Sequence, residues 1–252
     1  NITTLALVER EVEAPAVLSE AVFWWEVDDL SLSGNEILQW NDKTGNERHA
    51  VLGSTDKAAL VNGKAKFFFG DLKNYYTLAH ESALEPDSWS LLFVGGFAAS
   101  LDWVLLKATM HSPISAEGWG LKEIHSGGDY PYVQAYDSEY DSEPAGWRTT
   151  EILYLDGQEY EVDDPEAVGS ILVVYNSSTE TLDIFHSGGT SLSKSGVSLP
   201  RTAGSHSLWF GASASGAGYN GKACLAAFWG SALTTDERDL LFEYARSAHG
   251  AL

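Results

Sequence analysis

Short hydrophobic runs alternate along the chain with turns rich in Gly, Asn, Asp and Ser. Runs of this length that are rich in β-branched and aromatic residues, with turn residues on both sides, are typical of β-strands. The sequence predicts strands at 21–27, 37–40, 65–69, 75–79, 89–97, 103–107, 118–124, 132–136, 149–155, 158–162, 170–175, 181–186, 208–212 and 223–229. This pattern predicts an all-β protein.

One segment near the C-terminus has a helical period instead. Between residues 233 and 248 the leucine, tyrosine and alanine side chains recur near one face of a 3.6-residue repeat, and the charged residues lie mostly elsewhere. Thr234 precedes Glu237 by three residues, which is the spacing of a capping box. The sequence therefore predicts one C-terminal helix that begins after Thr234.

Many short strands and a single helix favour a two-sheet antiparallel β-sandwich of the jelly-roll type. Residues 1–20 are acidic and mixed in character, so we expect a leader or anchoring segment there and one folded domain over 21–252. The Ser- and Gly-rich stretch 187–198 is predicted to be a long loop. Five tryptophans are expected in the core: Trp24, Trp25, Trp40, Trp209 and Trp229.

Composition narrows the possible partners. The 252 residues are 44% hydrophobic and 20% charged, which excludes a disordered chain. With 15 basic and 36 acidic residues the formal charge is −21, so phosphate backbones and anionic membranes are repelled. The longest apolar runs, such as 91–99, are too short to cross a bilayer. Cys224 is the only cysteine, which excludes an intrachain disulfide and favours a core position.

Four groups of residues, in this order, resemble a known fold family. They are Trp40-x-Asp42-x-x-Gly45-Asn46-x-x-His49-Ala50, the strand 89–94, the pair 171–175 and 182–186, and the closing segments 219–222 and 232–238. Together they cover roughly residues 22–249 and are similar to a laminin-G-like jelly roll of the concanavalin A-like lectin and glucanase superfamily. The resemblance implies two sheets packed face to face, ligands on a concave face or on rim loops, and an extracellular, cell-surface or virion-associated location.

One acidic run could carry hydrolysis. Glu161 and Asp163 would share a face of an extended strand, and Glu166 could supply the acid of a retaining glycosidase. The run resembles the catalytic strand of laminarinase-type hydrolases. Pro165, however, has no backbone N–H to donate to a neighbouring strand, and Glu166 would face the opposite side of the strand from Glu161. The alternative is a solvated acidic loop, and the sequence leans away from an enzyme.

A second acidic run could bind calcium. Asp137, Glu139, Asp141 and Glu143 place four carboxylates within seven residues, and calcium prefers hard oxygen ligands. The run matches no known calcium-loop template, so an exposed acidic loop is the alternative. The histidines are too scattered along the chain to support a zinc site.

Aromatic and acidic residues gather between positions 119 and 147. Sugar rings stack on aromatic faces while carboxylates accept hydrogen bonds from their hydroxyls, so these residues could form a glycan-binding surface. The candidates are Trp119, Asp129, Tyr130, Tyr132 and Trp147. The alternative is that such aromatics pack between the sheets.

Three functions stay open on this evidence. The first is a non-catalytic recognition or adhesion module that binds carbohydrate or a surface partner. The second is a structural component of a larger assembly, such as a virion decoration or appendage protein, held as a homo-oligomer or docked through residues 1–20. The third is a glycoside hydrolase. Fold alone cannot separate them, because one fold hosts many functions.

Overall fold

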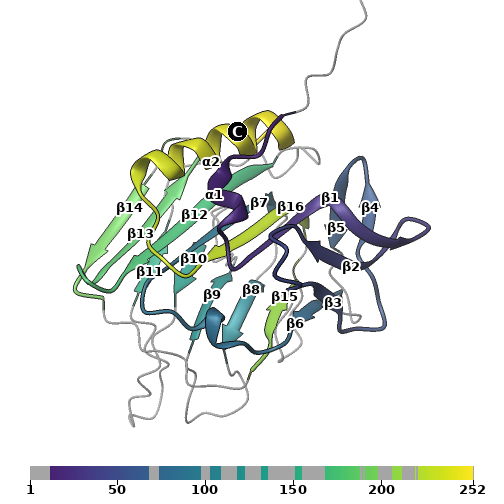
Figure 1. Cartoon of the computed structure of the whole chain (residues 1–252), viewed down its shortest axis with the longest axis horizontal. Coiled ribbons are helices and arrows are strands. Elements are labelled where there is room, and N and C mark those ends of the chain that lie inside the picture. Colours follow the sequence, from purple (N-terminus) through teal and green to yellow (C-terminus); the bar gives the residue numbers. More distant parts are fainter. Residues whose placement is uncertain are drawn as a thin grey trace, which may run out of the picture.

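The computed structural model describes residues 12–67, 74–97, 103–108, 118–122, 132–135, 151–154, 168–187, 189, 191–197, 206–211, 219 and 221–251. The helical elements are α1 (Ala16–Ser19), the 3-10 turn η1 (Ser82–Leu84) and α2 (Thr235–His249). The strands are β1 (Phe23–Ser33), β2 (Glu36–Asp42), β3 (Ala50–Leu52), β4 (Ala59–Val61), β5 (Lys64–Phe67), β6 (Tyr76–Leu78), β7 (Trp89–Phe97), β8 (Trp103–Ala108), β9 (Gly118–Lys122), β10 (Tyr132–Ala135), β11 (Glu151–Tyr154), β12 (Gly169–Asn176), β13 (Thr181–His186), β14 (Ser191–Ser195), β15 (Leu208–Phe210) and β16 (Gly221–Trp229). The predicted β-rich fold with a C-terminal helix is confirmed (Figure 1).

The central strands are buried on both faces. Strand β12 has a continuous apolar run, and its residues Ile171 and Val173 enter one core while Leu172 and Val174 enter another. Successive side chains of a strand point to opposite faces, so a run without polar residues requires cover on both sides. Strand β7 pairs with β12, β16 pairs with the other side of β7, and both follow the same rule.

The first core, which contains most of the buried aromatic residues in the described part of the chain, lies between two layers of strands. Phe228 of β16 stacks on Trp119 of β9 with ring centroids 4.5 Å apart, and Trp25 of β1 faces Phe210 of β15 at 5.7 Å. These contacts join strands that are distant in the hydrogen-bonded order. The layer of β12, β7, β16 and β1 therefore packs against the layer of β3, β6, β15, β8 and β9.

The two layers are not separate hydrogen-bonded sheets. The described strands form one 14-stranded sheet in the order β14-β13-β12-β7-β16-β5-β4-β2-β3-β6-β15-β8-β9, in which β1 also pairs with β16 and β2. Strands β4 and β5 carry the hydrogen bonding from one layer to the other. The predicted division into two sheets is thus not confirmed, while β10 and β11 pair apart from this network.

The helix α2 covers the second core. Its start is the predicted capping box, in which the Thr234 hydroxyl accepts from the Glu237 amide at 3.4 Å and the Glu237 carboxylate accepts from the Thr234 amide at 2.7 Å. The helix ends at Gly250, whose left-handed conformation suits a residue without Cβ. Leu241 and Ala245 are buried against the outer face of the β7, β12 and β16 layer. No helix in the described part of the chain is long and apolar enough to cross a membrane.

The end of the predicted leader belongs to this second core. Val17 and Leu18 of α1 are buried, and the Trp229 indole donates to the Val17 carbonyl oxygen at 2.8 Å. Burying each of these side chains contributes about 1.5–3 kcal/mol relative to exposure. Val17 and Leu18 of the predicted leader segment therefore contribute to the second core. Residues 1–11 lie outside the described residues.

Several strand boundaries differ from the sequence prediction, and two of these differences have a clear physical reason. Strand β1 does not end at Asp28 but continues to Ser33, because the register shift between Trp25 and Leu30 absorbs the acidic residues and pairing with β2 then resumes. The predicted loop 187–198 contains β14, which pairs with β13 along its length. Its Ser-rich sequence is compatible with an edge strand because an edge needs little hydrophobic character.

Candidate functional site

Most of the predicted site residues lie outside the described residues. This holds for the proposed catalytic group Glu161, Asp163 and Glu166, for the calcium candidates Asp137, Glu139, Asp141 and Glu143, and for Asp129, Tyr130 and Trp147 of the glycan surface. Tyr132 belongs to β10, but its side chain is not described. Within the described part of the chain, no group of three or more His, Cys, Asp or Glu residues could hold a metal ion.

Trp119 is a core residue. Its side chain is 4% exposed, its ring stacks on Phe228 with an interplanar angle of 8°, and its indole nitrogen donates to the Leu84 carbonyl oxygen at 3.1 Å. The ring therefore cannot offer a face to a ligand. This corrects its place in the predicted glycan surface and agrees with the alternative, which was packing between the layers.

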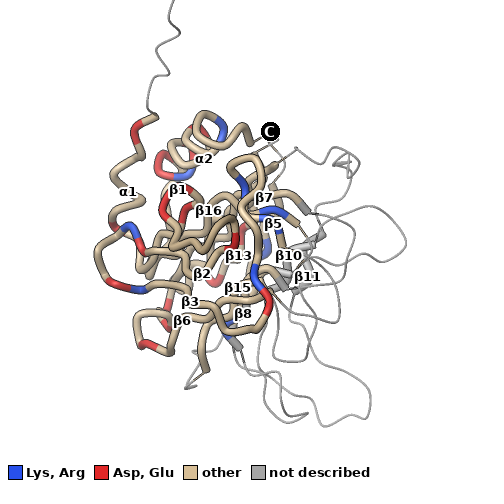
Figure 2. Tube along the Cα trace, turned by 90° about the vertical axis from the view of Figure 1, so that its right-hand side faces the viewer, with Lys and Arg blue, Asp and Glu red and all other residues tan. Residues whose placement is uncertain are grey.

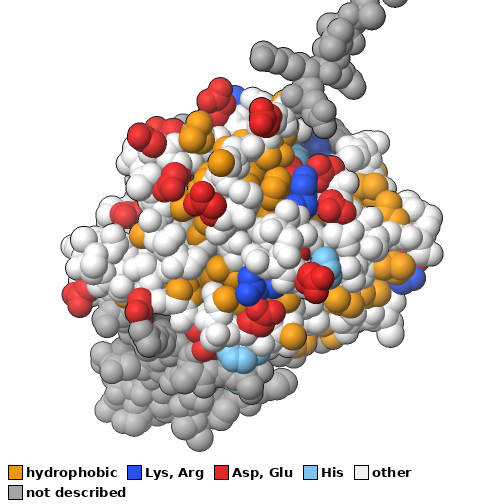
Figure 3. All heavy atoms as spheres, in the orientation of Figure 1, with side chains coloured by type: hydrophobic (Ala, Val, Ile, Leu, Met, Phe, Trp, Pro, Cys, Tyr) orange, Lys and Arg blue, Asp and Glu red, His pale blue; other side chains and the backbone are white. Residues whose placement is uncertain are grey.

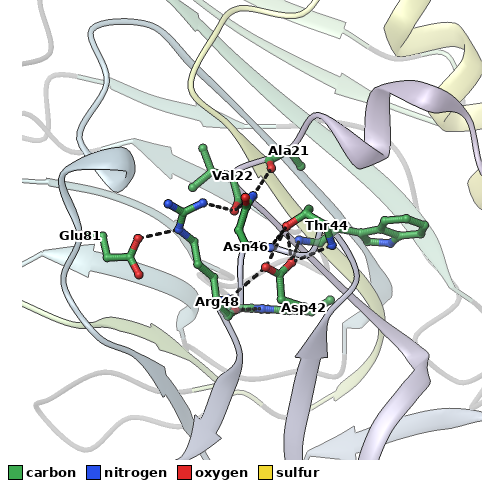
Figure 4. A network of polar contacts seen from close by, with 9 residues as sticks. Ala21, Val22, Asp42, Thr44, Asn46, Arg48 and Glu81 are labelled. Atoms are coloured by element: carbon green, nitrogen blue, oxygen red, sulfur yellow. Dashed lines mark hydrogen bonds and ion pairs between the residues drawn. The ribbon is translucent and has the colours of Figure 1, made fainter.

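The motif from Trp40 to Ala50 is organised around one buried carboxylate (Figure 4). Asp42 accepts hydrogen bonds from the amides of Trp24, Thr44 and Arg48 at 3.0–3.1 Å and from the Thr44 hydroxyl at 2.8 Å, while its own amide donates to His49 Nδ1 at 2.9 Å. A carboxylate with several amide donors fixes the path of a turn. The side chain of Asp42 is thus fully used in holding the loop.

The same loop is tied to the start of β1. The side-chain nitrogen of Asn46 donates to the carbonyl oxygens of Ala21 and Val22 (Figure 4). The Arg48 guanidinium donates to the Val22 carbonyl oxygen and forms an ion pair with Glu81 at 2.6 Å. These contacts explain the motif as a structural clamp between the loop and β1. None of them leaves a polar group directed at a ligand.

A second polar cluster lies between β1 and the end of α2. The Glu26 carboxylate is buried and accepts from Tyr244 Oη at 2.7 Å and Lys43 Nζ at 2.8 Å, and it lies 2.8 Å from His249 Nε2. Burial opposes its ionisation, but the hydrogen bonds from His249, Lys43 and Tyr244 outweigh burial and lower the pKa of Glu26. This cluster, named the Glu26 network below, also includes Asp28, which pairs with Lys43 at 2.8 Å.

The Glu26 network is closed to ligands. Lys43 loses solvation on burial, yet its hydrogen bonds to Asp28 and Glu26 raise the pKa of the ammonium group above its usual value. Lys43 also lies 4.4 Å from the centroid of the Trp24 ring, a cation–π contact. Because every member is paired with another, we assign the network to the attachment of α2.

An aromatic pair on the outer face of the second layer is different. Leu208 and Phe210 of β15 point into the core, so Trp209 between them points outward, where it is only half-buried. The ring of Tyr75 lies beside it with centroids 4.6 Å apart and an interplanar angle of 38°. We call Tyr75 and Trp209 the aromatic platform. The assignment of Trp209 to the core is therefore wrong, because the face of β15 decides its exposure.

Close packing fixes the Tyr75 ring. A Cβ atom added at Gly53 would lie 2.3 Å from Tyr75 Cε2, so the ring rests directly on the glycine backbone. The Tyr75 hydroxyl and the Trp209 indole N–H have no hydrogen-bond partner among the described residues. A rigid aromatic pair with two available polar tips is suited to binding a ligand that has both apolar and polar surface.

The platform continues into a row of side chains that crosses the five strands β1, β2, β3, β6 and β15. The cross-strand register places Ser31 beside Gln39, Gln39 beside Val51, Val51 beside Thr77 and Thr77 beside Trp209. We call these residues the outer row. All of them point away from the first core, since Trp40, Tyr76 and Phe210 next to them in sequence are buried there.

The outer row changes character along its length. Its β15 end is aromatic, its middle residue Val51 is 48% exposed, and its β1 end is polar. At the polar end the side-chain oxygen Oδ1 of Asn41 accepts from the Gln39 side chain at 2.8 Å and from the Ser31 hydroxyl at 3.2 Å. The side-chain nitrogen Nδ2 of Asn41 donates to Asp29 at 2.8 Å. The row thus offers stacking surface at one end and hydrogen-bonding groups at the other.

The sequence contains a weak signal for this site. Tyr75 and Tyr76 are adjacent, and neighbouring residues of a strand face opposite sides, so one of the two must point outward. The segment 208–210 has three large apolar residues in succession, which conceals the outward position of Trp209. Pairing of β6 with both β3 and β15 can be read only from the fold.

No protein-family model matches the sequence, and a search of curated proteins finds no match. Solved structures share its fold at low identity. The binding domain of botulinum neurotoxin DC in complex with rat synaptotagmin II has a TM-score of 0.60 and 10% identity, and the match covers 90% of this chain and 52% of that one.

Two other solved structures give similar values. One, of botulinum neurotoxin type C, is described as dependent for cell entry upon interaction with two ganglioside molecules, and it has a TM-score of 0.59, 11% identity and coverages of 91% and 52%. The other is the binding domain of Paraclostridial Mosquitocidal Protein 1, with a TM-score of 0.58, 12% identity and coverages of 89% and 52%. This chain spans about half the length of each, and at such identity the likeness concerns the fold alone.

Proposed function

We propose that this protein is a non-catalytic recognition module that binds carbohydrate through the outer row. The observation that carries the proposal is the aromatic platform, a partly exposed pair of tilted rings, Tyr75 and Trp209, whose two polar tips have no protein partner in the described structure. A sugar ring has an apolar face that stacks on aromatic rings and a rim of hydroxyls that needs hydrogen bonds. The platform supplies both kinds of contact.

The dimensions of the outer row favour an oligosaccharide over a single sugar. Trp209 and Gln39 are three strands apart along the row, which corresponds to roughly 14 Å at the usual strand spacing. A ligand that stacks on Trp209 and reaches the Gln39 and Asn41 amides must cross the exposed Val51 side chain. We therefore expect a chain of several sugar residues lying across the strands.

The similar folds agree with this class of partner. Two of the solved structures named above are binding domains, one of them in complex with synaptotagmin II, and the third is described with two ganglioside molecules. A glycan or a protein surface is therefore the expected kind of ligand. An extracellular, cell-surface or virion-associated location would follow from such a role. The facing layers around the first core support the resemblance to a laminin-G-like, concanavalin A-like fold, which stays part of the proposal.

Three earlier predictions stay predictions. Calcium binding by 137–143, hydrolysis by Glu161, Asp163 and Glu166, and assembly through residues 1–20 concern segments that lie wholly or mainly outside the described residues. Val17 and Leu18 are buried against the second core, so their side chains do not take part in such docking.

A glycan array tests the proposal. We expect the wild-type protein to bind one class of oligosaccharide, and Trp209→Ala and Tyr75→Ala to lose that binding. Trp209→Phe should retain part of it because a ring remains. Val61→Ala removes a side chain that is 41% exposed elsewhere on the surface and serves as the matched control. Repeating the array with EDTA tests calcium separately. Binding that survives both aromatic substitutions would refute a role of the outer row.

A further inference from the structure

A cavity of about 360 Å³ lies between α2 and the β13–β14 hairpin. This volume is within the range of small-molecule sites and accommodates one monosaccharide unit. Its walls come from the exposed side of α2 and from the end of β13 with the turn that follows it. None of these residues belongs to the outer row, the Glu26 network or the Asp42 loop.

The floor of the cavity is aromatic. Phe185 and Phe242 are partly buried against the second core, and both line the cavity. The Arg238 guanidinium lies 4.5 Å from the centroid of the Phe185 ring and is held by Asp239 at 2.8 Å. The guanidinium therefore lies against an aromatic ring at one side of the cavity, with its donors beside the stacking surface.

The charges around the cavity balance. Arg238 and Arg246 contribute two positive charges, and Asp239 and Glu243 contribute two negative charges. His186 adds none at neutral pH, because burial lowers its pKa to about 4. An anionic ligand would meet two carboxylates and a cationic ligand would meet two guanidinium groups, so neither class is favoured.

An apolar ligand is also disfavoured, because it would cover these charged groups without offering hydrogen bonds. A neutral ring with several hydroxyls avoids the repulsion that an anionic or a cationic ligand would meet, and it offers the hydrogen bonds that an apolar ligand lacks. Its hydroxyls can donate to Asp239 and Glu243 and accept from Arg246, while its C–H face lies on Phe242. From this elimination we propose that the cavity is a second carbohydrate site, which takes one uncharged monosaccharide unit.

This site lies on the opposite outer side of the molecule from the aromatic platform. α2 covers the outer face of one layer, the platform lies on the outer face of the other, and the first core separates them. Figures 1 and 2 both place α2 at one end and β3, β6 and β15 at the other. The inference extends the proposed carbohydrate recognition and makes the single chain bivalent.

The experiment is an NMR titration of the Trp209→Ala variant, in which the platform is disabled. The probes are glucose, galactose and mannose, with glucuronate and glucosamine as charged counterparts. The readout is the ring signal of His186, which lines the cavity and is 6% exposed. We expect at least one neutral hexose to shift this signal to saturation and to bind about tenfold more tightly than either charged sugar, a difference of about 1.4 kcal/mol.

Two serine substitutions supply the matched control. Ser191 pairs with Phe185 and shares its face, so Ser191→Trp should fill the mouth of the cavity and abolish the shift. Ser195 is exposed on the same face of β14, about 13 Å along the strand, and Ser195→Trp should leave the shift unchanged. If Ser191→Trp melts early, Glu243→Ala replaces it, with an expected tenfold loss of affinity.

Three results would overturn the inference. They are a His186 signal that no neutral hexose shifts, a charged sugar that binds more tightly than the neutral ones, and a shift that survives Ser191→Trp. Failure of the outer row would be seen independently, as array binding that persists in Trp209→Ala and is lost in Ser191→Trp. The two proposals therefore fail in distinguishable ways.

Discussion

The Glu26 network and the aromatic platform contain the residue types that a functional site needs, but they differ in their unused bonding capacity. Glu26 is 1% exposed, and its carboxylate is satisfied by Lys43, Tyr244 and His249. Tyr75 and Trp209 are partly exposed, and their polar tips are without protein partners in the described structure. The comparison teaches that the dense charges of the Glu26 network are used up in attaching α2, whereas the aromatic platform keeps the unused contact surface that the proposed recognition requires.

The surface as a whole supports this distinction. In Figure 2 the acidic residues of the described chain are spread over several elements, including α2 and the α1 end. Figure 3 shows hydrophobic side chains in a broken band across one face, with acidic side chains distributed around them. The net charge of −21 therefore does not by itself locate a site.

The largest expected effect is on stability, from Glu26→Ala. Removing this carboxylate leaves Lys43 and His249 without their buried partner, and breaking a buried ion pair in this way costs about 3–5 kcal/mol. Urea unfolding would measure the loss. Asp28→Ala is the control, because Asp28 pairs with the same lysine from a 62% exposed position and should cost about 0–1 kcal/mol. Equal losses in the two variants would contradict a special role of burial.

The next effect is on binding, from Trp209→Ala. Loss of the stacking face should weaken oligosaccharide binding at least about tenfold, or 1.4 kcal/mol, because the platform is the main apolar contact. The same change should cost only about 0.5–1.5 kcal/mol of stability beyond the lost burial, the range for one aromatic pair. Calorimetry with the best array ligand and thermal unfolding would give the two values. If Trp209→Ala strongly destabilised the fold but left the affinity of the folded protein unchanged, the platform would have a structural role and not a binding role.

A smaller effect is expected from Gly53→Ala. The added methyl group would lie 2.3 Å from Tyr75 Cε2, so the ring must tilt away from its resting place. We expect ligand affinity to fall several-fold with little change in stability, since Gly53 is exposed. Gly230→Ala is the matched control, because its new methyl group has no neighbour closer than 3.6 Å. Calorimetry on both variants tests whether the position of the ring, and not merely its presence, matters.

The smallest effect concerns pH. The folded-state pKa of Glu26 lies below the ordinary value of 4.5, so its contribution to stability is complete above that pH and is lost as the pH falls through the folded pKa. Lys43 has a raised pKa, and its contribution is complete below 10.5 and is lost as the pH rises through the folded value. Unfolding curves measured across both ranges should show losses at each end. In Glu26→Gln the loss of unfolding free energy at low pH should be smaller than in the wild type. An equal loss at low pH would contradict the assignment of this effect to Glu26.

Much of the fold is already present in the hydrophobic pattern. The predicted ranges of β7 and β13 coincide with the observed strands, and the capping box at Thr234 sets the start of α2. These features depend on neighbours in sequence, so a period of 2.0 or 3.6 and a cap three residues away are sufficient. The sequence does not predict the α1 turn at Val17, because four residues carry no period and the turn is stabilised by packing in the second core and by the hydrogen bond from Trp229.

The sequence by itself determined the β-rich class, the C-terminal helix and the burial of Cys224. It also showed that the chain has more aromatic residues than one binding site needs. The tertiary structure decided which aromatic residues are free. Trp119 and Trp209 both lie in predicted strands, yet cross-layer stacking on Phe228 buries the first, and the outward face of β15 leaves the second partly exposed. The reason is that a strand fixes alternation, but only the pairing of distant strands determines which face meets the core and which meets solvent.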